Sequence, residues 1–116
     1  MIEDEDAVCD LLQEQLSGYG YSVSVAHDGV EGLEMIQDIE PDLIICDRAM
    51  PAMTGYELLE RLRGVYPQYQ NVPFVFLTAL SHPRDKQAVE PFKPTAYLEK
   101  PLDFDKLYKI IQDNIA

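Results

Sequence analysis

The sequence predicts an α/β protein, a doubly wound parallel sheet of five strands with helices on both faces. Two patterns carry this prediction. Stretches in which apolar residues recur at helical spacing alternate along the chain with short strand-like stretches. Several of these short stretches are apolar throughout, which is typical of parallel strands that helices cover on both faces.

The first half of the chain supplies two of the expected helices and two of the expected strands. Gly18 and Gly20 end the first helix, and Asp28 can cap the second. Residues 21–26 alternate at period two, as a half-buried strand does, and residues 43–46 form a continuous apolar strand. The apolar residues at helical spacing in this half are Val8, Leu11, Leu12, Leu16, Val30, Leu33 and Ile36.

The second half repeats this order. Gly55 opens a helix, a loop follows at 67–73, and Asp103 can cap the last helix. The expected strands are residues 74–77 and 96–99. The apolar stripes of the two helices consist of Leu58, Leu59, Leu62, Leu107, Ile110 and Ile111.

The first strand differs from the others, because only Met1 and Ile2 precede the acidic residues at positions 3 to 6. Strands usually have about five or six residues. We therefore expect either that residues precede Met1 in the natural protein or that this strand is truncated.

Polar side chains follow the expected strands where these end. They are Glu3, Asp4, Asp47, Thr78 and Lys100. In open α/β sheets ligands bind outside the carboxyl ends of the strands, so these groups should meet at one edge. Clustered carboxylates need a cation, and hard oxygen ligands suit Mg²⁺. A nearby lysine and hydroxyl suit the oxygens of a phosphoryl group.

Length, charge and cysteine content narrow the class of protein. We expect one domain over residues 1–116 with no room for an output domain. A net charge of −12 argues against direct nucleic-acid binding, which needs a basic face. No apolar run is long enough for a membrane span. Cys9 and Cys46 have neither metal-binding nor disulfide spacing, so we expect thiols in a reducing cytoplasm. His27 and His82 have no ligand spacing and are expected at the surface.

Four motifs give the whole chain a family resemblance: EDED at 3–6, DRAMPAMTG at 47–55, LTAL at 77–80 and YLEKP at 97–101. In this order and spacing the sequence resembles a response-regulator receiver domain of two-component phosphorelay signalling, similar to the chemotaxis regulators. The resemblance implies a flavodoxin-like receiver fold and a cytoplasmic signalling domain that catalyses only its own phosphotransfer and self-dephosphorylation.

The resemblance also implies roles for particular residues. Asp47 would be the phospho-acceptor, loaded by a sensor histidine kinase or a histidine phosphotransfer protein. Its cofactor would be Mg²⁺, and the implied metal ligands are Glu3, Asp4, Asp47 and the backbone carbonyl of Ala49. Thr78 and Lys100 would bind phosphoryl oxygens, and Thr78 and Tyr97 would form the switch that changes the output face. A homodimer through the fourth and fifth helix and strand face is a further implication.

Some readings remain open, and the sequence departs from the family pattern in places. A phosphorylation-independent interaction module with the same fold is the alternative function. An aspartyl phosphatase of the haloacid dehalogenase type would need a second aspartate at position 49, where this chain has Ala49. Pro91 and Pro94 predict a short fourth helix, with Pro83 in its first turn and its end near Glu90. The apolar Ala49 and Leu80 could not orient an attacking water, so we expect slow self-dephosphorylation.

Overall fold

A computed structural model describes residues 1–3, 6–47, 53–78, 94–99 and 103–115. In chain order the elements are α1 (Asp6–Gly18), α2 (Gly29–Ile39), β1 (Ile44–Asp47), α3 (Gly55–Val65), the 3₁₀ helix η1 (Pro67–Tyr69), β2 (Phe74–Thr78), β3 (Ala96–Glu99) and α5 (Phe104–Asn114). The expected fourth helix, from Pro83 to near Glu90, lies outside the described residues.

Three strands form a parallel sheet in the order β1-β2-β3. The register aligns Ile44 with Phe74 at the start of β1 and Asp47 with Leu77 at its end. The described strands lie within one or two residues of the predicted ones. Strands and helices alternate with the strands parallel, so the predicted fold class is confirmed.

The predicted five-stranded sheet is only partly formed among the described residues, because two of its expected strands are isolated bridges. Ile2 pairs in parallel with Ala26 on one side and with Cys46 on the other. The prediction of a full strand over residues 21–26 was therefore wrong in extent. The physical reason is that, among the described residues, the hydrogen bonds between the two segments join only Met1 and Glu3 to Ser24 and Ala26, too few for a longer ladder.

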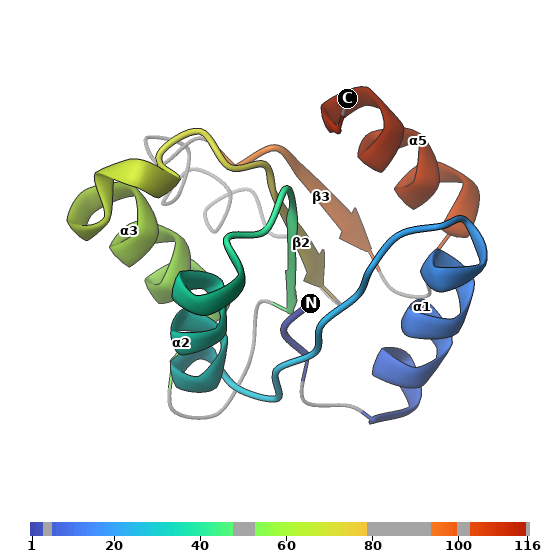
Figure 1. The fold of residues 1–116 in the computed structure, drawn as a ribbon, viewed down its shortest axis with the longest axis horizontal. Helices are drawn as coiled ribbons and strands as arrows, with labels where there is room; N and C mark the ends of the chain where they lie inside the picture. The colour runs from blue at the N-terminus through green and yellow to red at the C-terminus, as the bar shows by residue number, and fades with distance from the viewer. Residues whose placement is uncertain (4–5, 48–52, 79–93, 100–102, 116) are drawn as a thin grey trace.

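The helices cover the sheet in two layers, α2 and α3 on one face and α1 and α5 on the other (Figure 1). Ile44, Cys46 and Phe76 pack towards α2 and α3, whereas Ile45 and Leu77 pack towards α1 and α5. This alternation along each strand produces two hydrophobic clusters separated by the sheet. No helix in the described ranges is long and apolar enough to cross a membrane.

Side-chain caps fix where three of the helices begin. Asp28 accepts a hydrogen bond from the Glu31 amide at 2.8 Å and so caps α2, as predicted. Asp103 accepts from two amides of the first turn of α5, also as predicted. The cap of α3 is Thr54, which accepts from the Glu57 amide. Each cap satisfies helix amides that have no partner within the helix.

Two glycines of α2 allow it to approach the rest of the protein closely. A Cβ at Gly32 would lie 2.5 Å from Ile2 Cδ1, and a Cβ at Gly29 would lie 2.7 Å from Met53 Cβ. Both distances are too short for real carbon atoms, so α2 can occupy this position only with glycine facing its neighbours. The start of α2 therefore packs directly on the first segment and on the segment that precedes α3.

Candidate functional site

Asp47 is the last residue of β1 and follows three buried apolar residues. Its side chain is nearly buried, with 7% of its surface exposed. Its amide donates a hydrogen bond to the Ile2 carbonyl at 2.8 Å, and the Cys46 thiol donates to the Asp47 carbonyl at 3.2 Å. The backbone of Asp47 is thus fixed between the first segment and β2, at the edge where the sequence places it.

Glu3 occupies the corresponding place in the first segment. Ile2 pairs with Cys46, so Glu3 is level with Asp47, and the alternation of side chains places both on the α1–α5 side of the sheet. The Glu3 side chain is fully buried, and its amide donates to the Ala26 carbonyl at 3.0 Å. Two carboxylates from adjacent segments therefore share this edge.

The edge continues through the ends of β2 and β3. Thr78 ends β2 one residue beyond Leu77, which pairs with Asp47, and Thr78 itself pairs with Glu99 of β3. The register thus places the backbone of Thr78 at the same edge, as predicted. The remaining predicted site residues, Asp4, Ala49 and Lys100, lie outside the described residues.

Tyr97 lies within β3, where it pairs with Phe76 of β2. Its half-buried ring stacks on the Phe76 ring with centroids 5.4 Å apart and planes at 20°. Phe76 also contacts the rings of Tyr56, edge-on at 4.9 Å, and Phe74, tilted at 5.0 Å. Tyr97 is therefore one member of an aromatic cluster with Tyr56, Phe74 and Phe76. Phe76 and Tyr97 each lie two residues before the end of their strand.

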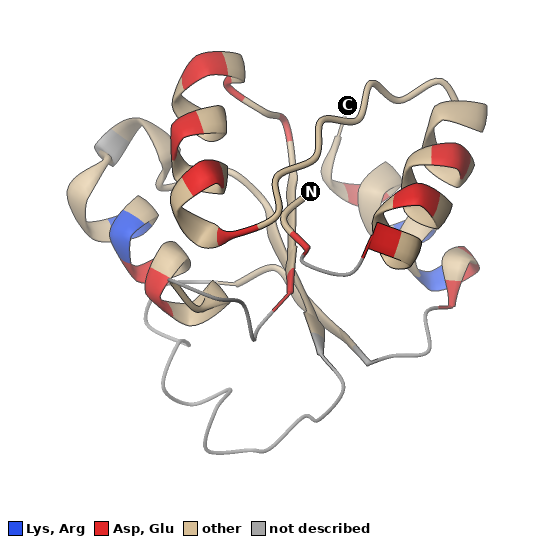
Figure 2. Ribbon diagram, turned by 90° about the horizontal axis from the view of Figure 1, so that it is seen from below, with Lys and Arg blue, Asp and Glu red and all other residues tan. Residues whose placement is uncertain are grey.

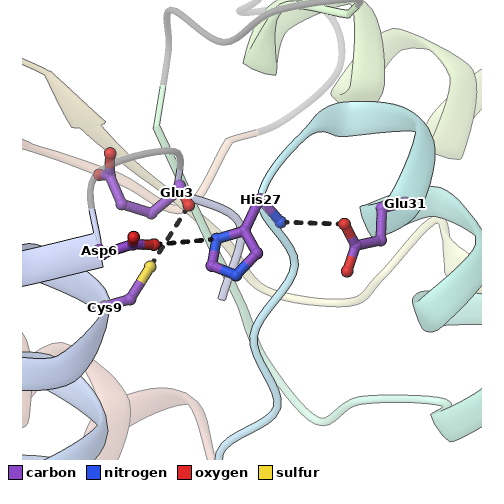
Figure 3. A network of polar contacts seen from close by, with 5 residues as sticks. All are labelled: Glu3, Asp6, Cys9, His27 and Glu31. Carbon is purple, nitrogen blue, oxygen red and sulfur yellow. Dashed lines mark hydrogen bonds and ion pairs between the residues drawn. The ribbon is translucent and has the colours of Figure 1, made fainter.

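A polar network that the sequence analysis missed borders this edge (Figure 3). His27 Nδ1 lies 3.7 Å from Asp6 Oδ1 at the start of α1, and the His27 amide donates to Glu31 Oε2 at 3.5 Å. The His27 side chain is 53% exposed, so the expected surface position is confirmed. Because His27 follows a segment that pairs in the sheet, the rule that placed Asp47 at the edge could have placed His27 there too.

Both cysteines are buried thiols, as expected. The Cys9 thiol donates to the Glu3 carbonyl at 3.3 Å. Burial raises the pKa of Cys46 well above its ordinary value, and the adjacent negative charge of Asp47 raises it further. Burial likewise raises the pKa of Cys9 to about 11, and the charges of Glu3 and Asp6 add to this effect. Both thiols therefore stay protonated at neutral pH, as hydrogen-bond donors beside the acidic edge.

Negative charge dominates the helices around the site (Figure 2). Among the described residues, α1 and α2 carry acidic but no basic side chains, and the basic side chains lie on α3 and α5. No group of three or more histidine, cysteine, aspartate or glutamate side chains within the described ranges could hold a metal ion. Glu3 and Asp47 supply carboxylate oxygens of the kind that Mg²⁺ prefers. These two residues fit a cation at this edge, but a complete site would need further ligands.

The fold and this edge define a class of protein, a flavodoxin-like α/β domain with carboxylates at the carboxyl ends of its parallel strands. The model of the response regulator receiver domain family matches residues 1–112. The chain belongs to this family.

Relatives and solved structures agree with this assignment. The chain is 36% identical over 118 residues to the transcriptional regulatory protein ZraR of Klebsiella oxytoca, and it is 36% identical over 107 residues to the response regulator MprA of Mycobacterium tuberculosis. The matches cover 100% and 92% of this chain but only 26% and 45% of those two proteins. The solved structure of the Vibrio cholerae chemotaxis protein CheY4 superposes with a TM-score of 0.90 at 32% identity, covering 98% of this chain and 94% of that one.

Proposed function

We propose that this receiver domain accepts a phosphoryl group on Asp47 from a histidine kinase or a histidine phosphotransfer protein, in a reaction that depends on Mg²⁺. The observation that carries the proposal is the position of Asp47. It is a nearly buried carboxylate at the end of β1, level with the fully buried Glu3 on the adjacent segment. In parallel α/β sheets this edge is where ligands bind.

The transfer is a displacement at phosphorus. A carboxylate oxygen of Asp47 attacks the phosphorus of a phosphohistidine, the bond between phosphorus and the imidazole nitrogen breaks, and its electron pair stays on that nitrogen. The product is an acyl phosphate. Phosphoryl transfer depends mainly on positioning and on electrostatic stabilisation. The hydrogen bond from the Asp47 amide to the Ile2 carbonyl and the pairing of β1 with β2 would supply the positioning.

The cation would be held by Glu3, Asp4, Asp47 and the backbone carbonyl of Ala49, with Glu3 acting partly through water. Mg²⁺ would neutralise the negative charge that carboxylates and phosphoryl group share. The position of Glu3 supports this part of the proposal, since it is buried level with Asp47 and carboxylate oxygens are the ligands that Mg²⁺ prefers. Lys100 and Thr78 would bind the remaining phosphoryl oxygens.

Phosphorylation would become a signal through a shift between two conformations. The new charge and oxygens at the end of β1 would draw Thr78 towards them, and Tyr97 would turn inward. The stacking of Tyr97 on Phe76 supports a role for this tyrosine, because any turn of the ring must exchange that contact for another. The output surface would be the face formed by the fourth and fifth helices and strands, through which the active form could also dimerise.

Labelling with acetyl phosphate tests the function without the partner kinase. Intact-mass spectrometry should detect one added phosphoryl group, dependent on Mg²⁺ and lost in Asp47→Asn. Asp42→Asn is the matched control, because Asp42 is exposed just before the other end of β1 and should leave labelling unchanged. Phosphate incorporated into Asp47→Asn at another residue would overturn the assignment. No labelling of the folded wild-type chain would favour the phosphorylation-independent interaction module.

The lifetime of the phosphoryl group is a separate part of the proposal. Ala49 and Leu80 have no side-chain group that could orient water, so we expect slow hydrolysis of the labelled protein. The decay of the phosphorylated mass after acetyl phosphate is removed measures it. Decay within seconds without a phosphatase would contradict this expectation.

A further inference from the structure

The first turn of α2 contacts the segment that leads from Asp47 to α3. Gly29 opens α2 and is buried, and Met53, two residues before α3, is buried against it. A Cβ on Gly29 would lie 2.7 Å from Met53 Cβ and 2.8 Å from the Met53 carbonyl oxygen. Backbone therefore lies against backbone at this contact, and only glycine leaves room for it.

The α2 side of this contact is tied to the segment that carries Glu3. Ala26, three residues before Gly29, donates to the Met1 carbonyl at 2.9 Å and accepts from the Glu3 amide at 3.0 Å. The Asp28 side chain then fixes where α2 begins. A displacement of Gly29 would therefore move residues that are bonded to the first segment.

The Met53 side of the contact is tied to the segment that carries Asp47. Five residues separate Met53 from Asp47 in the chain, and they include Ala49, whose carbonyl is one of the proposed Mg²⁺ ligands. The sheet holds Asp47 through its amide and through the pairing of β1 with β2. Thr54 caps α3 directly after Met53. Both ends of the segment between Asp47 and α3 are thus held, one in the sheet and the other on Gly29.

The second glycine of this turn, Gly32, meets a different kind of neighbour. A Cβ there would lie 2.5 Å from Ile2 Cδ1 and 2.8 Å from Ile2 Cγ1. These are side-chain atoms, which can move by a change of rotamer. The Met53 carbonyl has no such freedom. A side chain at Gly29 must therefore displace a backbone segment, whereas one at Gly32 displaces a side chain of the core.

We propose that Gly29 is a positioning residue of the Mg²⁺ site, because it sets the distance between the segment that carries Glu3 and the segment that follows Asp47. Mg²⁺ demands near-ideal octahedral geometry with short bonds to oxygen, so a small displacement of one ligand segment weakens its binding. The inference rests on the proposed function, since it takes the Mg²⁺ site at this edge as given.

Magnesium chloride titrations of the wild type, Gly29→Ala and Gly32→Ala test this role. The amide signals of Glu3 and Asp47 in two-dimensional NMR spectra report the binding. Gly29→Ala should weaken the affinity for Mg²⁺ by about tenfold, the lower end of the effect of residues that orient metal ligands. Gly32→Ala is the matched control. Both variants should lower the midpoint of urea unfolding, but Gly32→Ala should keep the Mg²⁺ affinity of the wild type.

Met53→Ala provides a second variant that adds no volume and so tests the contact even if Gly29→Ala does not fold. Met53 Cγ would lie 3.1 Å from a Cβ on Gly29, so truncating this side chain loosens the same contact and should also weaken Mg²⁺ binding. Leu33→Ala is its control, because Leu33 and Met53 belong to one hydrophobic cluster and are similarly buried, with 9% and 8% of their surface exposed.

The outcomes separate this inference from the proposed function. Unchanged Mg²⁺ affinity in folded Gly29→Ala or in Met53→Ala would overturn the positioning role, and so would equal losses of affinity in each variant and its control. A folded wild-type chain whose Glu3 and Asp47 signals do not respond to Mg²⁺ would instead overturn the Mg²⁺ site itself, and the positioning role with it.

Discussion

Replacing Phe76 by leucine tests whether the aromatic cluster behind the site stabilises the protein as its geometry implies. Phe76 is fully buried and contacts three rings, those of Tyr56, Phe74 and Tyr97. Aromatic pairs at such distances contribute about 0.5–1.5 kcal/mol each beyond the area they bury. Losing three pairs while keeping most of the apolar volume should lower the free energy of unfolding by about 2–4 kcal/mol.

Urea unfolding followed by circular dichroism at equilibrium measures this loss. The transition midpoint should fall by roughly 1 M or more with an unchanged slope, since small domains lose about 1–3 kcal/mol per molar urea. Tyr19→Leu is the matched control. Tyr19 also stacks on another ring, that of Tyr108 at 4.1 Å, but it is half exposed and, among the described residues, it contacts that ring alone. Its replacement should cost less than about 1 kcal/mol.

A double-mutant cycle isolates the contact between Phe76 and Tyr97. The coupling between Phe76→Leu and Tyr97→Leu should be about 0.5–1.5 kcal/mol if the two stacked rings interact as the structure indicates. A cost below about 1 kcal/mol for Phe76→Leu, or a coupling of zero, would refute the reasoning. The coupling also bounds how strongly this contact opposes any reorientation of Tyr97.

Three further outcomes follow from packing, hydrogen bonding and titration. Gly32→Ala should destabilise the protein by about 1–2 kcal/mol because its Cβ meets the first segment, whereas Gly64→Ala, with open space around it, should stabilise it by up to about 1 kcal/mol in thermal unfolding. Arg63→Met should lower the free energy of unfolding in urea by about 1–3 kcal/mol, because the Arg63 guanidinium donates to two carbonyls after α3, at 2.5 and 2.7 Å. Arg61 is exposed, so Arg61→Met is the control and should change this free energy little. Equal losses in the two variants would contradict this account. The pKa of Cys9 rises from 9.0 to about 11 on folding, so the contribution of its thiol to stability is complete below pH 9 and is lost as pH rises towards 11. Cys9→Ala should therefore make the free energy of unfolding less dependent on pH in this range. An unchanged dependence of this free energy on pH would show that the thiol is not its source.

The parts of the fold that the sequence predicts well are those with local physical signals. Asp28 and Asp103 identify two helix starts because capping is a short-range hydrogen bond between residues near in sequence. The continuous apolar runs identify β1 and β2 to within one residue, since burial on both faces leaves no polar position inside the strand. Asp47 and Thr78 could be assigned to one edge because the parallel arrangement aligns strand ends.

Other features depended on partners that a local pattern does not contain. Residues 21–26 alternate as a strand does, yet only Ala26 forms a bridge, because pairing requires a neighbouring segment of matching length. The start of α3 at Gly55 was predicted correctly, but its cap, Thr54, was not identified. The contacts of His27 with Asp6 and Glu31 join segments separated in sequence, so their presence could be read only from the fold.

The anchoring of Asp47 has a consequence for where motion can occur in this domain. Its amide is bonded to Ile2, its carbonyl receives the Cys46 thiol, and its Cα is in register with Leu77. The backbone of the residue proposed to be phosphorylated is thus held in place by the sheet on both sides. A chemical change at its carboxylate should therefore be passed on by movement of neighbouring side chains, while the strand that carries Asp47 keeps its place in the sheet.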